Sequence, residues 1–258
     1  MNRFSTAILA ALLSCTALPS HALDCKSTVT AADKVVALNE INNLMGRYSH
    51  LALLRGESTL EELFAMQTEG VFWKTATGPV GIAAMKAKFL KPGETAPALT
   101  PGRMFVHSML TPVIEIAADG KTAQGVWDSW GPLVTDGDAL GDWLWVKYGV
   151  DFIKENDQWK IWHLQVFPIF NTPYNKSITE TAQAGGNNNG RPRQGQPGMG
   201  AAPGNAQASM QGPKDPLWIY DGKTAVRGPY VPAPYCSYDE NKSSAQYADY
   251  SKYVAPLR

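Results

Sequence analysis

His107 lies just ahead of a long run of apolar and β-branched residues, and its side chain is suited to proton transfer. An imidazole has an unperturbed pKa of about 6.5, so it exchanges protons near neutral pH. After residue 22 the only other histidines are His50 and His163. We expect His107 to be an acid or base in a pocket; the alternative is a strand histidine bonded to a backbone carbonyl.

His163 and Tyr48 are the residues that we expect to assist His107. In the segment WKIWHLQV, strand alternation puts Ile161 and His163 on one face, so His163 faces the cavity if Ile161 faces the helices. Tyr48 fits the apolar face of a helix, and its hydroxyl can donate a hydrogen bond to a substrate oxygen. His50 points about 200° away from Tyr48 and is expected on the surface or at the pocket rim. Structural packing is the alternative for His163 and Tyr48.

Two carboxylates are candidates for a general base, Asp128 in GVWDSWGP and Asp142 in GDWLW. An aromatic cleft raises the pKa of a carboxylate and makes it a workable base at neutral pH. Turn capping or solvent exposure would explain both residues equally well.

Aromatic residues cluster on two strands that we expect to be neighbours. Alternation sends some of them inward, where they would bind a flat, apolar ligand; the alternative is an ordinary core or a dimer face. The proposed substrate-binding residues are Trp127, Trp130, Trp143, Trp145 and Tyr148.

Several function classes lack their sequence signals. The chain has no Gly-x-Ser-x-Gly elbow, P-loop or dinucleotide fingerprint, and no His/Cys cluster at metal-ligand spacing. We therefore expect no cofactor and no metal. The 23 basic and 23 acidic residues balance and are interspersed, so we expect no nucleic-acid partner.

The first 22 residues have the layout of a secretory signal peptide, with an apolar run from Ala7 to Leu13 and a small-x-small ending. That run is shorter than the roughly 20 residues of a membrane helix. We expect an exported protein, periplasmic or secreted, with no membrane span. Cleavage would leave Cys25 and Cys236, which we predict form a disulfide; two buried free thiols are the alternative.

The order of elements predicts an α+β domain in which helices cover one face of a curved antiparallel sheet. Thr30 and Asp33 resemble a capping box at the start of the first helix. We place the main domain at 23–178, a flexible low-complexity linker at 179–215 and a Tyr-rich tail, docked on the main domain, at 216–258. Helices are expected at 30–54, 58–66 and 80–90, and strands at 71–75, 105–116, 122–134, 143–154 and 159–170.

Four segments resemble the SnoaL-like branch of the nuclear transport factor 2-like superfamily: LMGRYSHLALLRGESTLEELFAMQTEGVFW, GPVGIAAMKAKF, HSMLTPVIEIAADGKTAQGVW and YGVDFIKENDQWKIWHLQV. The resemblance covers roughly residues 33–172. It implies a cone-shaped curved antiparallel sheet packed by three N-terminal helices, with a possible homodimer. The family includes polyketide cyclases, dehydratases, isomerases, lyases and non-enzymatic pockets, so the fold alone does not select the chemistry.

His107 is the one residue that this resemblance carries over, because His107 and Glu115 match the eight-residue spacing of the dehydratase members. The chain reads Leu53-Leu54-Arg55 where catalytic members carry a carboxylate, and the second histidine of the dehydratases is absent near 130–132. If the protein is an enzyme, its general base must therefore be a residue other than this carboxylate.

These patterns favour a cofactor-independent lyase, dehydratase or isomerase that acts on an aromatic or polycyclic small molecule by proton transfer. A non-catalytic protein that binds an apolar ligand is the main alternative. A scaffold that dimerises through its outer sheet face is a third.

Overall fold

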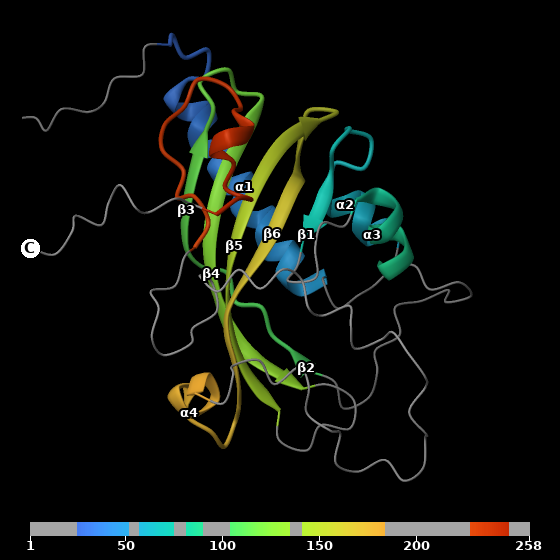
Figure 1. The fold of residues 1–258 in the computed structure, drawn as a ribbon. Coiled ribbons are helices and arrows are strands. Elements are labelled where there is room, and N and C mark those ends of the chain that lie inside the picture. Colours follow the sequence, from blue (N-terminus) through green and yellow to red (C-terminus); the bar gives the residue numbers. More distant parts are fainter. Residues whose placement is uncertain are drawn as a thin grey trace, which may run out of the picture.

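The computed structural model describes residues 25–51, 57–74, 81–89, 104–134, 141–183 and 228–247. In these ranges six strands form one curled sheet with the order β1-β6-β5-β4-β2, and β3 also pairs with β4 (Figure 1). The elements are α1 Ala31–Leu51, α2 Glu57–Leu63, β1 Phe72–Lys74, α3 Ile82–Phe89, β2 Met104–Phe105, β3 Leu110–Ile116, β4 Thr122–Val134, β5 Asp142–Glu155, β6 Gln158–Pro173, α4 Ile178–Gln183 and a 3-10 helix at Glu240–Lys242.

The long helix α1 begins with the predicted capping box. Thr30 Oγ1 accepts a hydrogen bond from the Asp33 main-chain N–H at 3.1 Å, and Asp33 Oδ2 accepts one from the Thr30 N–H at 3.0 Å. This exchange satisfies two main-chain donors at the helix start. The buried side of α1 then carries Ala37, Ile41, Leu44, Met45 and Tyr48, which pack on the sheet.

The sheet is mixed, which differs from the antiparallel sheet that we expected. The β3–β4, β4–β5 and β5–β6 pairs are antiparallel, but β1 runs parallel to β6. Adjacent strands joined by a tight hairpin must be antiparallel, but β1 is not joined to β6 by a hairpin. It follows helices α1 and α2 and pairs with a strand far along the chain, so it can run in either direction. The β5–β6 hairpin turns at Asn156 and Asp157, whose φ angles of 51° and 60° fit a two-residue primed turn. The predicted strand 105–116 is divided, because residues 106–109 belong to neither β2 nor β3.

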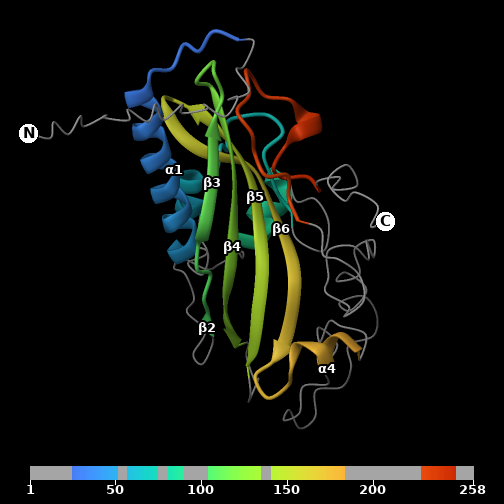
Figure 2. The same ribbon diagram turned by 90° about the vertical axis from the view of Figure 1, so that its left-hand side faces the viewer.

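The sheet has two faces that we name by what covers them. The helix face packs on α1 and carries Trp127, Tyr148 and Leu164 in the core. The outer face is the opposite side, where residues 228–247, here called the strap, cross the upper ends of the strands (Figure 2). In the described part of the chain, no helix has the length and apolar character needed to cross a bilayer.

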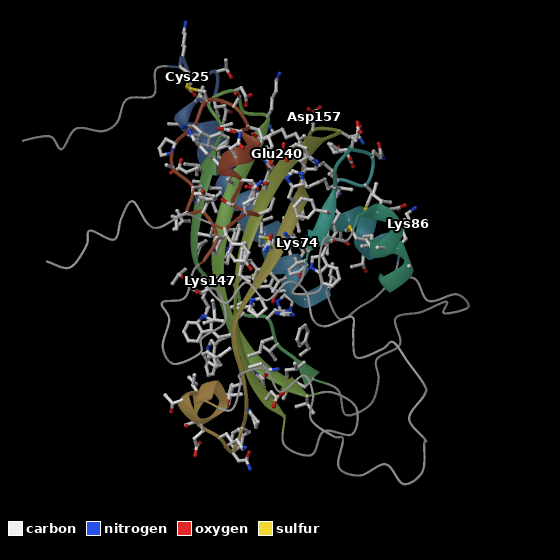
Figure 3. All side chains as sticks on the ribbon, in the orientation of Figure 1. Cys25, Lys74, Lys86, Lys147, Asp157 and Glu240 are labelled. Atoms are coloured by element: carbon white, nitrogen blue, oxygen red, sulfur yellow. A yellow bond between two sulfur atoms is a disulfide. The ribbon has the colours of Figure 1, made fainter. Side chains whose placement is uncertain are left out.

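The predicted disulfide between Cys25 and Cys236 is present, with the two Cα atoms 5.8 Å apart. It joins the start of the described chain to the strap, and Figure 3 places Cys25 and Glu240 at the same end of the molecule. The main-chain N–H groups of Ala118 and Asp119 donate to the carbonyls of Tyr235 and Cys236 at 2.9 and 3.1 Å. Strap and sheet are therefore joined by covalent and hydrogen bonds.

The proposed domain boundaries fall partly outside the described ranges. Residues 1–24 and 184–227 lie outside them, as do residues 248–258 of the tail. The predicted linker begins at residue 179, whereas the structure continues helix α4 to Gln183.

Candidate functional site

His107 is buried on the helix face, in the segment that joins β2 to β3, with 7% of its surface exposed. Its Nδ1 atom lies 2.8 Å from the Tyr148 hydroxyl of β5. The Ser49 hydroxyl of α1 donates a hydrogen bond to the His107 carbonyl oxygen, and the Phe105 ring packs edge-on at a centroid distance of 3.8 Å. Helix, strand and loop thus converge to fix this imidazole.

Burial sets the charge of His107. Desolvation penalises the imidazolium and lowers the pKa of His107 to about 4. The side chain is therefore neutral at pH 7, with Nδ1 engaged by Tyr148.

Tyr48 and Tyr148 lie beside His107 in the same buried region. Their rings meet edge-on at 5.7 Å, and 3% of Tyr48 and none of Tyr148 is exposed. Burial is the main cause that raises the pKa of both phenols. Both hydroxyls are protonated at neutral pH and act as hydrogen-bond donors or acceptors.

His163 does not join this group, because it lies on the outer face. It pairs with Phe72 of β1 and stacks on that ring at 4.6 Å, whereas the next pair, Trp73 and Leu164, faces the core. The alternation on which we relied is broken between Ile161 and His163, where the β5–β6 register shifts. A bulge adds one residue to one strand and turns the following side chains to the other face.

On the outer face, His163 takes part in a buried cluster around Asp151. This fully buried carboxylate accepts hydrogen bonds from His163 Nδ1 at 2.9 Å and from three strap groups, which are the Tyr238 hydroxyl at 3.2 Å, the Ser243 hydroxyl at 2.5 Å and the Ser244 main-chain N–H at 3.1 Å. The cluster binds the strap to the sheet. We did not predict Asp151, although a lone acidic residue in the apolar strand segment YGVDFI was a signal for a buried, bonded carboxylate.

The candidate carboxylates are also distant from His107. Asp128 is on the outer face, where it forms an ion pair with Lys147 at 2.8 Å and accepts a bond from Trp145 Nε1 at 3.3 Å. Partial burial raises its pKa, but bonds from Lys147, Trp145 and Thr111 outweigh that effect, and its pKa is lowered. Asp142 shares the face of Tyr148 but lies six residues along β5, about 20 Å away.

The five aromatic residues proposed for substrate binding are divided between the two faces. Trp127 and Tyr148 are buried on the helix face. Trp130 stacks on Trp143 at 4.6 Å on the outer face, where Trp130 and Trp145 are 42% and 36% exposed. Only the first two can contact a ligand that also reaches His107.

The described residues contain no group of three or more His, Cys, Asp or Glu side chains arranged to hold a metal ion. The chemistry that the helix-face site offers from its own side chains is proton transfer by a neutral imidazole with two phenol hydroxyls beside it. The Ser49 hydroxyl helps to fix the His107 main chain by its hydrogen bond to the carbonyl oxygen. The sequence analysis did not identify Ser49. Its position next to Tyr48 on α1 is the only signal that the sequence contains for it.

The chain is similar to several solved structures, and no curated protein matches it. A hexachlorocyclohexane dehydrochlorinase, LinA-type3, from Novosphingobium barchaimii is 14% identical, with a TM-score of 0.46 over 57% of this chain and 97% of that one. A candidate scytalone dehydratase from Novosphingobium aromaticivorans is 17% identical, with a TM-score of 0.46 over 63% and 99%. A nuclear transport factor 2-like protein from Salmonella enterica is 16% identical, with a TM-score of 0.42 over 52% and 91%.

The sequence itself settles the family. The family model of the SnoaL-like domain matches residues 33–165, just over half of the chain. This range contains all but the first two residues of α1, strands β1 to β5, the first half of β6, and His107. The chain belongs to the SnoaL-like domain family, as its sequence segments predicted.

Proposed function

We propose that this protein catalyses cofactor-independent proton transfer on an aromatic or polycyclic small molecule, as a lyase, dehydratase or isomerase. The observation that carries the proposal is His107, a buried and neutral imidazole whose Nδ1 atom is held by Tyr148 at 2.8 Å. In this reaction His107 takes a proton from a substrate carbon. The C–H electron pair then forms a double bond as a leaving group departs, or shifts within the substrate.

The low pKa of His107 suits a base that must be free at neutral pH. A pKa of about 4 means that the imidazole binds no proton before the substrate arrives. The same low pKa makes the imidazolium a strong acid, so His107 returns the proton readily to a product atom. The substrate proton must be correspondingly acidic, as is a C–H beside a carbonyl or an aromatic ring.

Tyr48 is the proposed hydrogen-bond donor to a substrate oxygen. Burial raises its pKa, so the phenol keeps its proton at physiological pH. A neutral donor next to the base would stabilise negative charge that develops on a carbonyl or a leaving oxygen. Trp127 and Phe105 give this part of the helix face aromatic surfaces for a flat ligand.

A substrate screen with His107→Gln tests the proposal. Purified protein is incubated with phenolic, lignin-like and polycyclic compounds, and changes in conjugation are followed by absorbance. We expect turnover with the wild type, a loss of at least about 100-fold in His107→Gln, and no change in His50→Gln, a matched control at an exposed histidine of α1. Turnover that survives in His107→Gln would refute the assignment. Saturable binding without turnover, equal in all three proteins, would favour the alternative, a non-catalytic binding protein.

We also propose that the protein is exported and loses its first 22 residues. The Cys25–Cys236 disulfide supports this, because such bonds persist mainly in oxidising compartments. After expression of the whole sequence, intact mass of the soluble exported fraction should correspond to a chain that starts at Leu23 with no free thiol. A chain that keeps residue 1 and has three free thiols would contradict export.

A further inference from the structure

An exposed aromatic surface lies on the outer face of the sheet, beyond the end of the strap. Trp130 of β4 is paired with Trp145 of β5, and 42% and 36% of their surfaces are exposed. Trp145 is paired in turn with Phe170 of β6. Exposed groups of large apolar side chains commonly mark contact sites. We call this surface the aromatic patch, and its residues are Trp130, Trp143, Trp145, Phe170 and Tyr174.

The second half of the strap runs down the outer face towards the aromatic patch. Cys236 is bonded to the β3–β4 turn at the upper end of the sheet, and the Ser244 main-chain N–H is bonded to Asp151 of β5. The last described residue of the strap, Tyr247, packs edge-on against Phe167 of β6 with the ring centroids 4.7 Å apart. Each contact is nearer to the patch than the one before it.

The chain that follows Tyr247 is long enough to cover the patch. Phe170 is three residues along β6 from Phe167, which is about 10 Å at the rise of a strand. Trp130 is two strands away from Phe170, or about another 10 Å. Residues 248–258 follow Tyr247, and 11 residues span up to about 36 Å when extended.

The composition of residues 248–258, ADYSKYVAPLR, is complementary to the patch. Tyr250, Tyr253 and Leu257 supply apolar and aromatic surface, and tyrosine rings pack favourably on indoles. Asp249 comes two residues after Tyr247. Lys147, the register partner of Phe167, is a half-buried cation at the edge of the patch, and Figure 3 shows it lower on the sheet than Glu240 of the strap. An acidic residue at this point of the segment therefore meets a positive charge.

We propose that residues 248–258 dock on the aromatic patch of their own chain, so that the strap continues over the lower part of the outer face. The contact of Tyr247 with Phe167 tethers the segment at the edge of the patch. A tethered segment has an effective concentration on the order of millimolar, which favours it over a second copy of the chain. The inference is independent of the proposed function, because His107 and Tyr148 lie on the opposite face.

The exposure of the two tryptophans tests the proposal. In protein labelled with 5-fluorotryptophan, Trp130→Phe and Trp145→Phe assign the two ¹⁹F signals, and the shift between H₂O and D₂O reports the exposure of each indole. A chain that ends at Tyr247 keeps the disulfide and the described strap contacts. On this truncation the isotope shift of both signals should rise at least about twofold, because docked residues would exclude water from the indoles. The signal of Trp127, 2% exposed on the helix face, should not change.

Substitutions within the whole chain provide the matched control. Tyr250→Ser/Tyr253→Ser/Leu257→Ser should expose both indoles as truncation does, whereas Ser251→Ala in the same segment should not. Equal isotope shifts in the whole and the truncated chain would overturn the proposal. Protection that is lost on dilution, together with a dimeric mass by light scattering, would also overturn it, because a second copy would then cover the patch.

Discussion

Gly149 of β5 faces the strap so closely that it has no room for a side chain. A Cβ atom at this position would lie 1.7 Å from the Ser244 carbonyl oxygen and 2.8 Å from the Pro229 Cβ atom. Ordinary contacts begin at 3.4 Å, so Gly149→Ala requires the strap to retreat by about 1.7 Å, the difference between 3.4 and 1.7 Å. Both neighbours belong to the strap, and the substitution therefore tests strap docking directly.

The magnitude follows from the bonds that such a retreat would break. The Ser244 main-chain N–H donates to Asp151 at 3.1 Å, and adding more than 1 Å takes this contact beyond hydrogen-bonding distance. The neighbouring Ser243 and Tyr238 hydroxyls donate to the same carboxylate. Hydrogen bonds to charged groups each contribute about 1.5 to 3 kcal/mol, so the loss of two reduces the free energy of unfolding by at least about 3 kcal/mol.

The assay combines denaturant unfolding under non-reducing conditions with hydrogen exchange. Gly149→Ala should lower the free energy of unfolding, and exchange should accelerate at residues 228–247 and at the Ala118 and Asp119 amides, which donate to strap carbonyls. Gly46→Ala is the control, because Gly46 is in α1 with no atom within 4 Å of an added Cβ. It should raise the free energy of unfolding by about 0.5 to 1 kcal/mol. A Gly149→Ala protein as stable as the wild type, with unchanged strap exchange, would refute the reasoning.

Three further outcomes are expected. His107→Gln should flatten the dependence of the free energy of unfolding on pH, because the pKa of His107 is lowered to about 4 in the folded chain, against about 6.5 in the unfolded one. The neutral imidazole therefore costs the wild type no stability above pH 6.5, and the wild type loses up to about 3 kcal/mol, from the 2.5-unit difference, as the pH falls toward 4. Parallel stability curves for variant and wild type between pH 4 and 7 would contradict this. Replacing Cys25 and Cys236 together with Ala should lower the free energy of unfolding by up to about 5 kcal/mol in the chain-entropy model, measured by denaturation against the oxidised wild type; equal midpoints would argue against it. If the exposed outer-face tryptophans form a homodimer interface, light scattering should give a dimeric mass that Trp130→Ala/Trp145→Ala reduces to a monomer; a monomeric wild type at high concentration would exclude this interface.

Local sequence signals predicted the elements well because each had a physical cause within a few residues. The Thr30–Asp33 capping box marks the start of α1, and the Asn156-Asp157 pair marks the β5–β6 turn. The pairing of Cys25 with Cys236 was predictable by elimination, since only these cysteines remain after the expected cleavage. His107 was singled out by its residue type and its spacing to Glu115, and the structure buries it beside Tyr148. Its role in catalysis stays a prediction.

The site could be predicted only in part, because distant pairings decide which face a side chain occupies. His163 was expected beside Tyr48, but the register shift opposite Asp151 turns it to the outer face. Strand alternation places Trp127 and Trp130 on opposite faces of the sheet. The sequence alone does not reveal which of the two alternating sets of side chains packs against α1. The parallel direction of β1 depends on how the chain returns from two helices, and no single residue encodes it.

The partners of the buried groups were the least accessible to sequence reasoning. Tyr148 is 41 residues from His107, and Ser243 is 92 residues from Asp151. Each pair exists only because the sheet and the strap bring separate segments together. A sequence can indicate that a buried polar residue needs a partner, but the fold determines which residue that partner is.

The bond between Cys25 and Cys236 has a topological consequence. With a sequence separation of 211, it closes residues 25–236 into one covalent ring. A single proteolytic cut between residues 184 and 227 would open that ring without dividing the molecule, and the strap would remain attached to the sheet. Such a cut would leave the mass of the non-reduced protein greater by one water molecule, and two fragments would separate only after reduction.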